Sequence, residues 1–149
     1  MTKRTVLLVE DNADDEKLAL KAFGHTDLPH EVVVERDGEG ALAYLFGTRL
    51  DAPRSEDRLP ALVLLDLNLP GIDGLEVLRR IRTEPRTRLF PVVVLTSSIE
   101  ERDLVRSYSL GANSYIRKPV NFVEFVDTVR ELATYWLVRN EPPPDRGGV

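Results

Sequence analysis

The sequence contains no cysteine, so it can form neither a disulfide framework nor a metal site with thiolate ligands. It has no apolar run that approaches the roughly 20 residues needed to span a membrane. A signal peptide is also missing, because the first apolar run covers only residues 5–9 and ends at acidic residues. These absences predict a cytoplasmic protein that does not act at a membrane.

Excess basic charge is missing as well, and a net charge of −5 argues against direct binding to nucleic acid. The 149 residues suffice for one domain with one core, and they show no internal repeat. We expect residues 1–140 to form that domain and residues 141–149, rich in proline and glycine, to form a flexible tail. This division leaves no room for a DNA-binding output domain.

Four consecutive apolar residues, 62–65, lead directly into Asp66. Such an unbroken run is typical of a strand buried on both faces of a parallel sheet. Pro70 and Gly71 then turn the chain. Asp66 is therefore predicted at the carboxyl end of a central strand, the edge where open α/β sheets bind ligands.

Predicted strands and helices alternate along the whole chain. The strands are expected at residues 5–9, 31–35, 62–65, 91–95 and 113–117, and the helices at 14–23, 39–46, 74–82, 100–110 and 121–138. This alternation, with right-handed crossovers, predicts an α/β fold of the flavodoxin-like, doubly wound type. We expect five parallel strands in the order 2-1-3-4-5, with five helices on both faces. Residues 47–60 are predicted to form an unusually long surface loop.

Polar side chains stand at the ends of four predicted strands. They are Glu10, Asp11, Asp66, Thr96 and Lys118. Because carboxylates held close together repel one another, a cation is expected among them, and Mg2+ prefers such oxygen ligands. A carboxylate beside Mg2+, with a lysine and a hydroxyl around it, is equipped to act as a nucleophile toward phosphorus.

Each of these residues also has an ordinary structural interpretation. Asp11 can cap a helix, Thr96 can satisfy its own backbone, and Lys118 can lie along the surface as most lysines do. No single residue decides between the two interpretations. Their common position at the ends of four buried strands favours the phosphoryl site.

Four segments resemble the receiver domain of two-component response regulators. They are LVED at 8–11, LLDLNLPGIDG at 64–74, VLTS at 94–97 and YIRKP at 115–119. The resemblance covers about residues 4–138. It implies that Asp66 accepts a phosphoryl group from a histidine of a sensor kinase. It also implies that the chain catalyses only its own phosphotransfer and autodephosphorylation.

The resemblance implies a metal site around the phosphoacceptor. Asp11, Asp66 and the backbone carbonyl of Asn68 are expected to ligate Mg2+, and Glu10 is expected to act through a metal-bound water. Asn68 and Ser98 are expected to flank the path of the water that hydrolyses the acyl phosphate, and so to tune its lifetime.

The resemblance also implies a switch. Thr96 and Lys118 are expected to contact the phosphoryl oxygens, and the Lys118–Pro119 peptide bond is expected to be cis. Tyr115 is expected to move inward as Thr96 closes on the phosphoryl group. The residues alone also fit a plain, half-buried aromatic at Tyr115.

The long loop at 47–60 and a long last helix with an aromatic end are similar to stand-alone response regulators of phytochrome-type kinases, which we expect as partners. The last helix has a predicted core stripe of Phe122, Val126, Val129, Ala133, Trp136 and Leu137. A second apolar stripe consists of Phe125, Leu132 and Tyr135. Because a small domain rarely leaves such residues in water, the second stripe is either part of a broad core stripe or the interface of a homodimer. We predict the homodimer, built on the last helix and the fifth strand, with the fourth helix as a further candidate.

Three other functions fit the sequence less well. A haloacid dehalogenase-type hydrolase usually has a second acid two residues after its nucleophile, where this chain has Asn68. A phosphate-independent pseudo-receiver would not require the complete set of Glu10, Asp11, Asp66, Thr96 and Lys118. A histidine phosphotransfer protein needs a histidine on an exposed helix face, whereas His25 and His30 lie in or beside a predicted loop.

Overall fold

The computed structural model describes residues 4–25, 30–47 and 60–143. It contains one parallel sheet with the strand order β2-β1-β3-β4-β5, which confirms the predicted flavodoxin-like topology. The strands are β1 (Arg4–Val9), β2 (His30–Glu35), β3 (Pro60–Leu65), β4 (Val92–Thr96) and β5 (Ser114–Arg117). The helices are α1 (Ala13–Phe23), α2 (Gly38–Phe46), α3 (Gly74–Thr83), α4 (Glu101–Ser109) and α5 (Phe122–Thr134), with a π-helical turn, η2 (Tyr135–Arg139).

Two predicted segments lie mostly outside the described residues: the loop at 47–60, of which Gly47 and Pro60 are described, and the tail at 141–149, of which 141–143 are described. None of the helices in the described part of the chain is long and apolar enough to cross a membrane.

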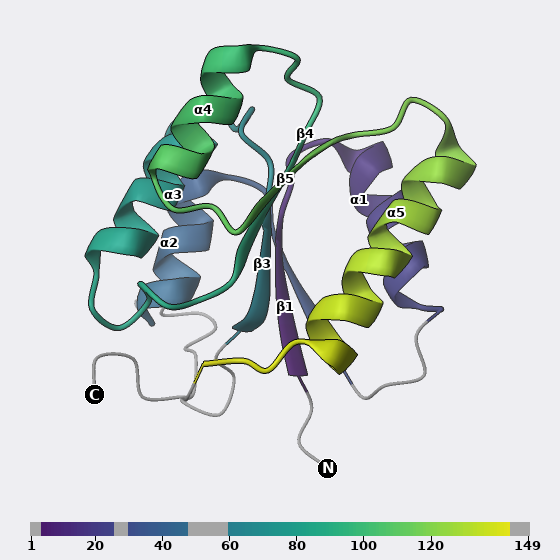
Figure 1. Cartoon of the computed structure of the whole chain (residues 1–149), viewed down its shortest axis with the longest axis horizontal. Coiled ribbons are helices and arrows are strands. Elements are labelled where there is room, and N and C mark those ends of the chain that lie inside the picture. Colours follow the sequence, from purple (N-terminus) through teal and green to yellow (C-terminus); the bar gives the residue numbers. More distant parts are fainter. Residues whose placement is uncertain (1–3, 26–29, 48–59, 144–149) are drawn as a thin grey trace.

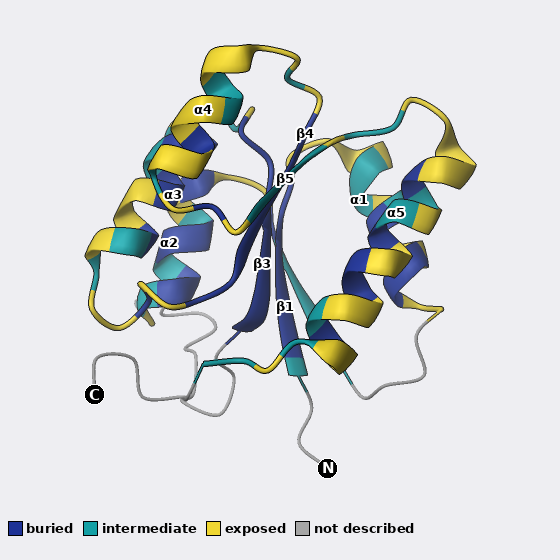
Figure 2. Ribbon diagram, in the orientation of Figure 1, coloured by how far each residue is buried: buried dark blue, intermediate teal, exposed yellow. Residues whose placement is uncertain are grey.

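The sheet lies between two layers of helices (Figure 1). Helices α1 and α5 cover one face, and α2, α3 and α4 cover the other. The three central strands are buried along their length, except for Arg4 at the start of β1 (Figure 2). The two edge strands of the sheet, β2 and β5, are only partly buried.

The side chains of β1 show how the apolar runs form this sheet. Val6 and Leu8 pack into the core beneath α1 and α5, whereas Leu7 and Val9 pack into the core beneath α2 and α3. None of the four is more than 2% exposed. Because successive side chains of a strand point to opposite faces, a strand covered on both faces needs apolar residues at every position.

Four helices begin at a side-chain cap, in which a side-chain oxygen accepts a hydrogen bond from a backbone N–H three residues later. The caps are Asn12, Asp37, Asp73 and Asn121. Such a cap typically contributes about 1 kcal/mol to stability. The caps fix where each helix starts after its strand, and so fix the position of the residues at the strand ends.

The packing of α5 corrects the predicted stripes. Phe125 and Leu132, which we predicted on an exposed dimer face, are 2% and 8% exposed and belong to the core with Val129. Phe122, which we predicted in the core, is 71% exposed. The buried face follows the i, i+4, i+7 spacing from Phe125 and keeps Val129 from the predicted core stripe. Phe122 lies on the same side, seven residues before Val129, but it is the first residue of the helix and is left in solvent. Tyr135 is exposed, as predicted.

Helix α4 leaves apolar side chains exposed. Tyr108 is 51% exposed, and Leu104 is half-buried. The buried residue of this helix is the small Ser107. Helix α4 therefore packs on the sheet through a narrow contact and leaves much of its surface in solvent (Figure 2).

Candidate functional site

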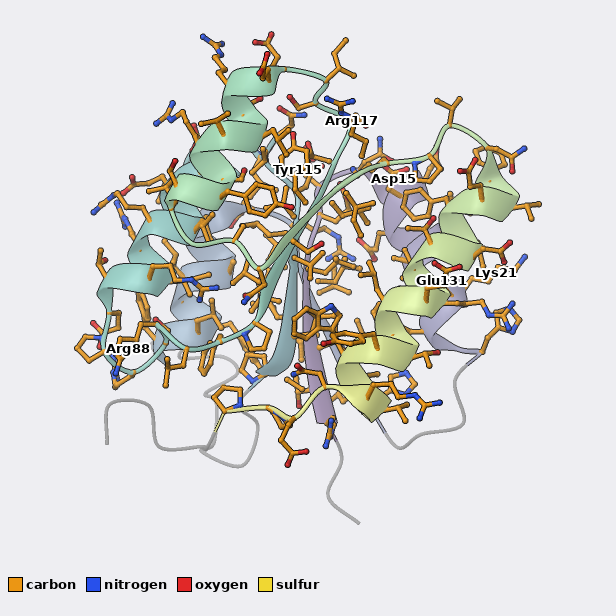
Figure 3. The ribbon with its side chains drawn as sticks, viewed as in Figure 1. Asp15, Lys21, Arg88, Tyr115, Arg117 and Glu131 are labelled. Atoms are coloured by element: carbon orange, nitrogen blue, oxygen red, sulfur yellow. The ribbon has the colours of Figure 1, made fainter. Side chains whose placement is uncertain are left out.

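Polar residues from separate strands meet at the carboxyl edge of the sheet. Glu10 follows β1, Asp66 follows β3, and Lys118 follows β5. In Figure 3 this edge lies in the upper half of the view, where Asp15 and Tyr115 are labelled. The structure therefore brings together residues that lie more than 100 positions apart in the sequence.

The ammonium group of Lys118 lies at the centre of the site. Its Nζ is 2.8 Å from Glu10 Oε1, 2.8 Å from Asp15 Oδ2 and 2.8 Å from Asp66 Oδ2. Burial alone lowers the pKa of Lys118, but its bonds to the three carboxylates outweigh this effect and raise that pKa above its ordinary value. Lys118 therefore stays charged, and its three N–H donors each have an acceptor.

Glu10 is the most deeply placed acid of the site. Glu10 is only 2% exposed. This burial raises the pKa of its carboxyl group to about 7, although the bond to Lys118 opposes the shift. The nearby charge of Asp66 adds to the rise. The Asn12 backbone N–H donates to Glu10 Oε2 at 3.1 Å and fixes the carboxyl group. Burial therefore disfavours the charged form of Glu10, whereas the bond to Lys118 favours it.

The carboxylates of Glu10, Asp11 and Asp66 form an acidic cluster, in which one oxygen from each residue lies within 4.8 Å of the others. Asp11 is exposed, whereas Glu10 and Asp66 are buried. Three carboxylates at this spacing suit a hard divalent cation, because its charge offsets their repulsion and its ligands are oxygens. The donor set therefore fits a divalent metal ion.

The backbone around Asp66 is held in place by two contacts. The Asn68 backbone N–H donates to Asp66 Oδ1 at 3.1 Å, and the Gly74 backbone N–H donates to Leu67 O at 3.0 Å. A side chain at position 74 would collide with the carbonyl oxygen of Asp66 and come within 2.6 Å of Leu67 Cα. Gly74 thus lets the start of α3 close against the strand end that carries Asp66.

Thr96 and Tyr115 meet at the backbone of Ser98. Thr96 is fully buried, and its Oγ1 accepts a hydrogen bond from the Ser98 N–H at 3.3 Å. The Tyr115 hydroxyl donates to Ser98 O at 3.4 Å. The Ser98 hydroxyl donates to Asp103 Oδ2 at 2.6 Å and so joins the loop after β4 to the first turn of α4. This connects Thr96 and Tyr115 to the position of α4.

The Lys118–Pro119 peptide bond is trans, because the described chain contains no cis peptide bond. This corrects the expected cis bond, and trans is the intrinsically preferred form of such bonds by about 0.5–1 kcal/mol. Lys118 still reaches the carboxylates, since its backbone N–H donates to Thr96 O at 2.8 Å and extends the pairing of β4 with β5.

Sequence reasoning missed two partners in the site. Asp15 lies in the first turn of α1, where acids are common because they interact favourably with the helix dipole, so the sequence gives no separate sign of its bond to Lys118. The bond between Ser98 and Asp103 carries no sequence signal either. It depends on the path of the loop after β4, which the residue pattern does not reveal.

Comparisons with known proteins agree with this geometry. The profile of the family described as "Response regulator receiver domain" matches residues 6–130. The chain is 44% identical to the probable methanogenesis regulatory protein FilR2 of Methanothrix harundinacea, covering 93% of this chain and 86% of that protein. It is 39% identical to the response regulator Rcp1 of Synechocystis, covering 90% of this chain and 89% of Rcp1.

Solved structures give the same result. The phosphorylated cyanobacterial phytochrome response regulator RcpA superimposes with a TM-score of 0.89 at 42% identity, over 95% of this chain and 99% of that one. Rcp1 has been crystallised in a form bound to Mn2+ and superimposes with a TM-score of 0.86 at 37% identity, over 94% of this chain and 99% of that one. With its fold, its acidic cluster and these matches, the chain belongs to the response regulator receiver domain family.

Proposed function

We propose that the protein accepts a phosphoryl group on Asp66 from a phosphohistidine of a sensor kinase. The observation that supports this most directly is the surroundings of Asp66. Its carboxylate is buried, accepts a hydrogen bond from a backbone N–H and forms an ion pair with Lys118. It also lies beside two further acids. Receiver domains of this family catalyse no turnover beyond phosphotransfer.

In the proposed transfer, an Asp66 carboxylate oxygen attacks phosphorus, and the bond between phosphorus and the imidazole nitrogen breaks. The electron pair of that bond returns to the imidazole, which takes up a proton from solvent. Lys118 donates hydrogen bonds to the phosphoryl oxygens, and the buried Thr96 hydroxyl, at the end of β4, supplies a further contact.

We propose that Mg2+ is the resident metal and that Asp11, Asp66 and the Asn68 carbonyl hold it, with Glu10 acting through a bound water. The fit of the acidic cluster to a divalent cation supports this assignment. When bound, Mg2+ would supply positive charge beside the phosphoryl oxygens. Tyr115 and Thr96 share Ser98 as a partner, which supports their proposed role as a coupled switch. Asn68 and Ser98 keep their proposed influence on the lifetime of the acyl phosphate.

Intact-mass measurement with acetyl phosphate and Mg2+ tests the proposal. Wild type should gain one phosphoryl group, and the gain should require the metal. Asp66→Asn should gain none, whereas Asp73→Asn, an exposed acid seven residues away that caps α3, should gain one as wild type does. Absence of any adduct on wild type would leave a phosphate-independent interaction module as the remaining function.

We propose a phytochrome-type histidine kinase as the partner, because RcpA is a phytochrome response regulator and covers nearly the whole chain. We propose that the phosphotransfer between kinase and receiver takes place in the cytoplasm, as predicted. Transfer from the phosphorylated kinase to wild type, and not to Asp66→Asn, would support the pairing. A kinase that phosphorylates an unrelated receiver at the same rate would argue against it.

We also propose a homodimer, now placed on the outer face of α5 and η2. A surface hollow there is lined by Asp127, Arg130, Glu131, Thr134, Tyr135 and Arg139. Asp127 and Arg139 lie at opposite ends of this face, so two antiparallel copies would bring opposite charges together. Light scattering should give a dimer for wild type and for Arg86→Glu, an exposed site elsewhere, and a monomer for Arg139→Glu. A monomeric wild type would contradict the assembly.

A further inference from the structure

The ammonium of Lys118 and the acidic cluster share two carboxylates. Lys118 pairs with Glu10, Asp15 and Asp66, each at 2.8 Å. The cluster suited to a metal ion consists of Glu10, Asp11 and Asp66. Asp11 therefore belongs to the cluster but is not among these partners of Lys118. Asp15, in contrast, pairs with Lys118 but lies outside the cluster.

A divalent cation in the cluster would change the forces on Lys118. Its charge would neutralise the carboxylates of Glu10 and Asp66, and it would repel the ammonium. The attraction that holds Lys118 between these two acids would fall. Asp15 would keep its full charge, because it is not part of the cluster.

We propose that Asp15 is the positioning residue that keeps Lys118 in the site once a metal ion occupies the acidic cluster. The proposal rests on the proposed metal site. It explains why an α1 residue reaches Lys118 at all, since two strand-end acids already pair with that lysine.

The local structure of Asp15 suits this role. Its backbone N–H donates to the capping Asn12 Oδ1 at 3.0 Å, so the residue is fixed in the first turn of α1. The side chain is 23% exposed, against 6% for Lys118, so the pair is largely shielded from water. Side chains in a helix lean toward its N-terminus, which here is the carboxyl edge of the sheet. Figure 3 shows Asp15 at that edge.

This arrangement has a consequence for phosphotransfer. A lysine with one N–H donor committed to Asp15 retains two for other acceptors. Lys118 would then stay at a fixed distance from Asp66 while the partners on its other side change from carboxylates to phosphoryl oxygens. Asp15 itself would touch neither the metal nor the phosphoryl group.

Chemical labelling of Lys118 tests the inference without any phosphotransfer. The protein is pulsed with an amine-acylating reagent with and without saturating Mg2+, and modification is read by peptide mass spectrometry. Lys17 and Lys21, exposed on α1, report the reagent dose within the same molecule. We expect Mg2+ to raise labelling of Lys118 at least fivefold in Asp15→Asn, and by less than twofold in wild type.

Asp14→Asn is the matched control, because it removes the same charge from the same helical turn at an exposed position. It should behave as wild type. Equal labelling of Lys118 in Asp15→Asn and Asp14→Asn would overturn the inference, and so would a wild type that binds no Mg2+ by calorimetry. A wild type that binds Mg2+ but gains no phosphoryl group would contradict the proposed function only, and labelling would still decide the role of Asp15.

Phosphorylation by acetyl phosphate supplies a second measurement. In Asp15→Asn the maximal rate should fall at least fivefold, whereas the Mg2+ concentration for half-maximal rate should stay within twofold of wild type. Asp15→Glu, which keeps the charge, should recover part of the rate. A reduced Mg2+ affinity with an unchanged maximal rate would show that Asp15 serves the metal and not Lys118, and would overturn the inference.

Discussion

Gly74 at the start of α3 lies directly against the backbone of Asp66, with no space for a Cβ atom between them. The contact joins the helix start to the strand end that presents the phosphoacceptor. It makes the position of Asp66 sensitive to a single methyl group.

We expect Gly74→Ala to destabilise the protein by about 2 kcal/mol, because the added Cβ forces backbone atoms apart. Phosphoryl acceptance at Asp66 should slow in the same variant. Urea unfolding and intact-mass kinetics measure the two effects. Gly24→Ala is the control, since Gly24 has a helical φ of −65° and its added Cβ would lie 3.3 Å from the carbonyl oxygen of Lys21. Equal effects of the two substitutions would contradict the expectation.

The Ser98–Asp103 hydrogen bond should couple the two side chains energetically. In a double-mutant cycle with Ser98→Ala and Asp103→Asn, we expect a coupling energy of about 1 kcal/mol, since the bond is charge-assisted but only partly buried. Glu101→Gln removes a charge from the same turn of α4 and should show no coupling to Ser98→Ala. Additive effects of Ser98→Ala and Asp103→Asn would mean that the bond does not form in solution.

Ser107 carries a buried hydroxyl that has no hydrogen-bond partner among the described residues. Ser107→Ala should therefore stabilise the protein by about 1 kcal/mol, because it removes an unsatisfied polar group and improves helix propensity. Ser109→Ala, at an exposed position of α4, should gain only the smaller propensity term. Thermal unfolding of the two variants separates these contributions, and a lower Tm for Ser107→Ala would contradict the assignment.

Arg82 joins three segments at the end of the sheet opposite the site. Its guanidinium donates to the carbonyl oxygens of Gly111 and Phe90 at 2.8 and 2.7 Å, and to Asn113 Oδ1 at 2.9 Å. We expect Arg82→Lys to cost about 2 kcal/mol, because an ammonium cannot match the planar fork of donors. Arg86→Lys, an exposed position, should change the unfolding free energy by less than about 0.5 kcal/mol.

Metal binding should depend on pH through Glu10. Burial raises the pKa of Glu10 to about 7, and the proposed metal site needs this group in its charged form. Mg2+ affinity should therefore rise as the pH increases from 6 to 8, because protonation competes with the metal below the pKa. Calorimetry at several pH values measures the effect. Glu10→Gln should bind more weakly and without a step near pH 7; a step that persists in this variant would assign it to another group.

The fold was predictable because its signals are local. Four-residue apolar runs such as 62–65, each followed by polar residues, identify strands that are covered on both faces, and the crossover rule then orders them. The strand-end positions of Asp66 and Lys118 follow from the same runs. Their closeness to each other follows from the strand order, which was predicted correctly.

Other features depend on rotations and torsions that the residue pattern does not fix. The apolar residues of α5 occupy one broad side of the helix that includes both Phe122 and Phe125, and the pattern does not show where along the helix this side leaves the core. Asp15 was assigned to the helix start because acids are common there for electrostatic reasons. The trans bond before Pro119 is a choice between two isomers of similar energy.

The alternation of side chains along β1 separates the molecule into two compartments. A substitution at Val6 or Leu8 alters the packing beneath α1 and α5, whereas one at Leu7 or Val9 alters the packing beneath α2 and α3. The sheet thus lies between two separate hydrophobic cores. A change of packing on one face therefore reaches the other face only through the backbone of the strands, which also carry the phosphoacceptor edge.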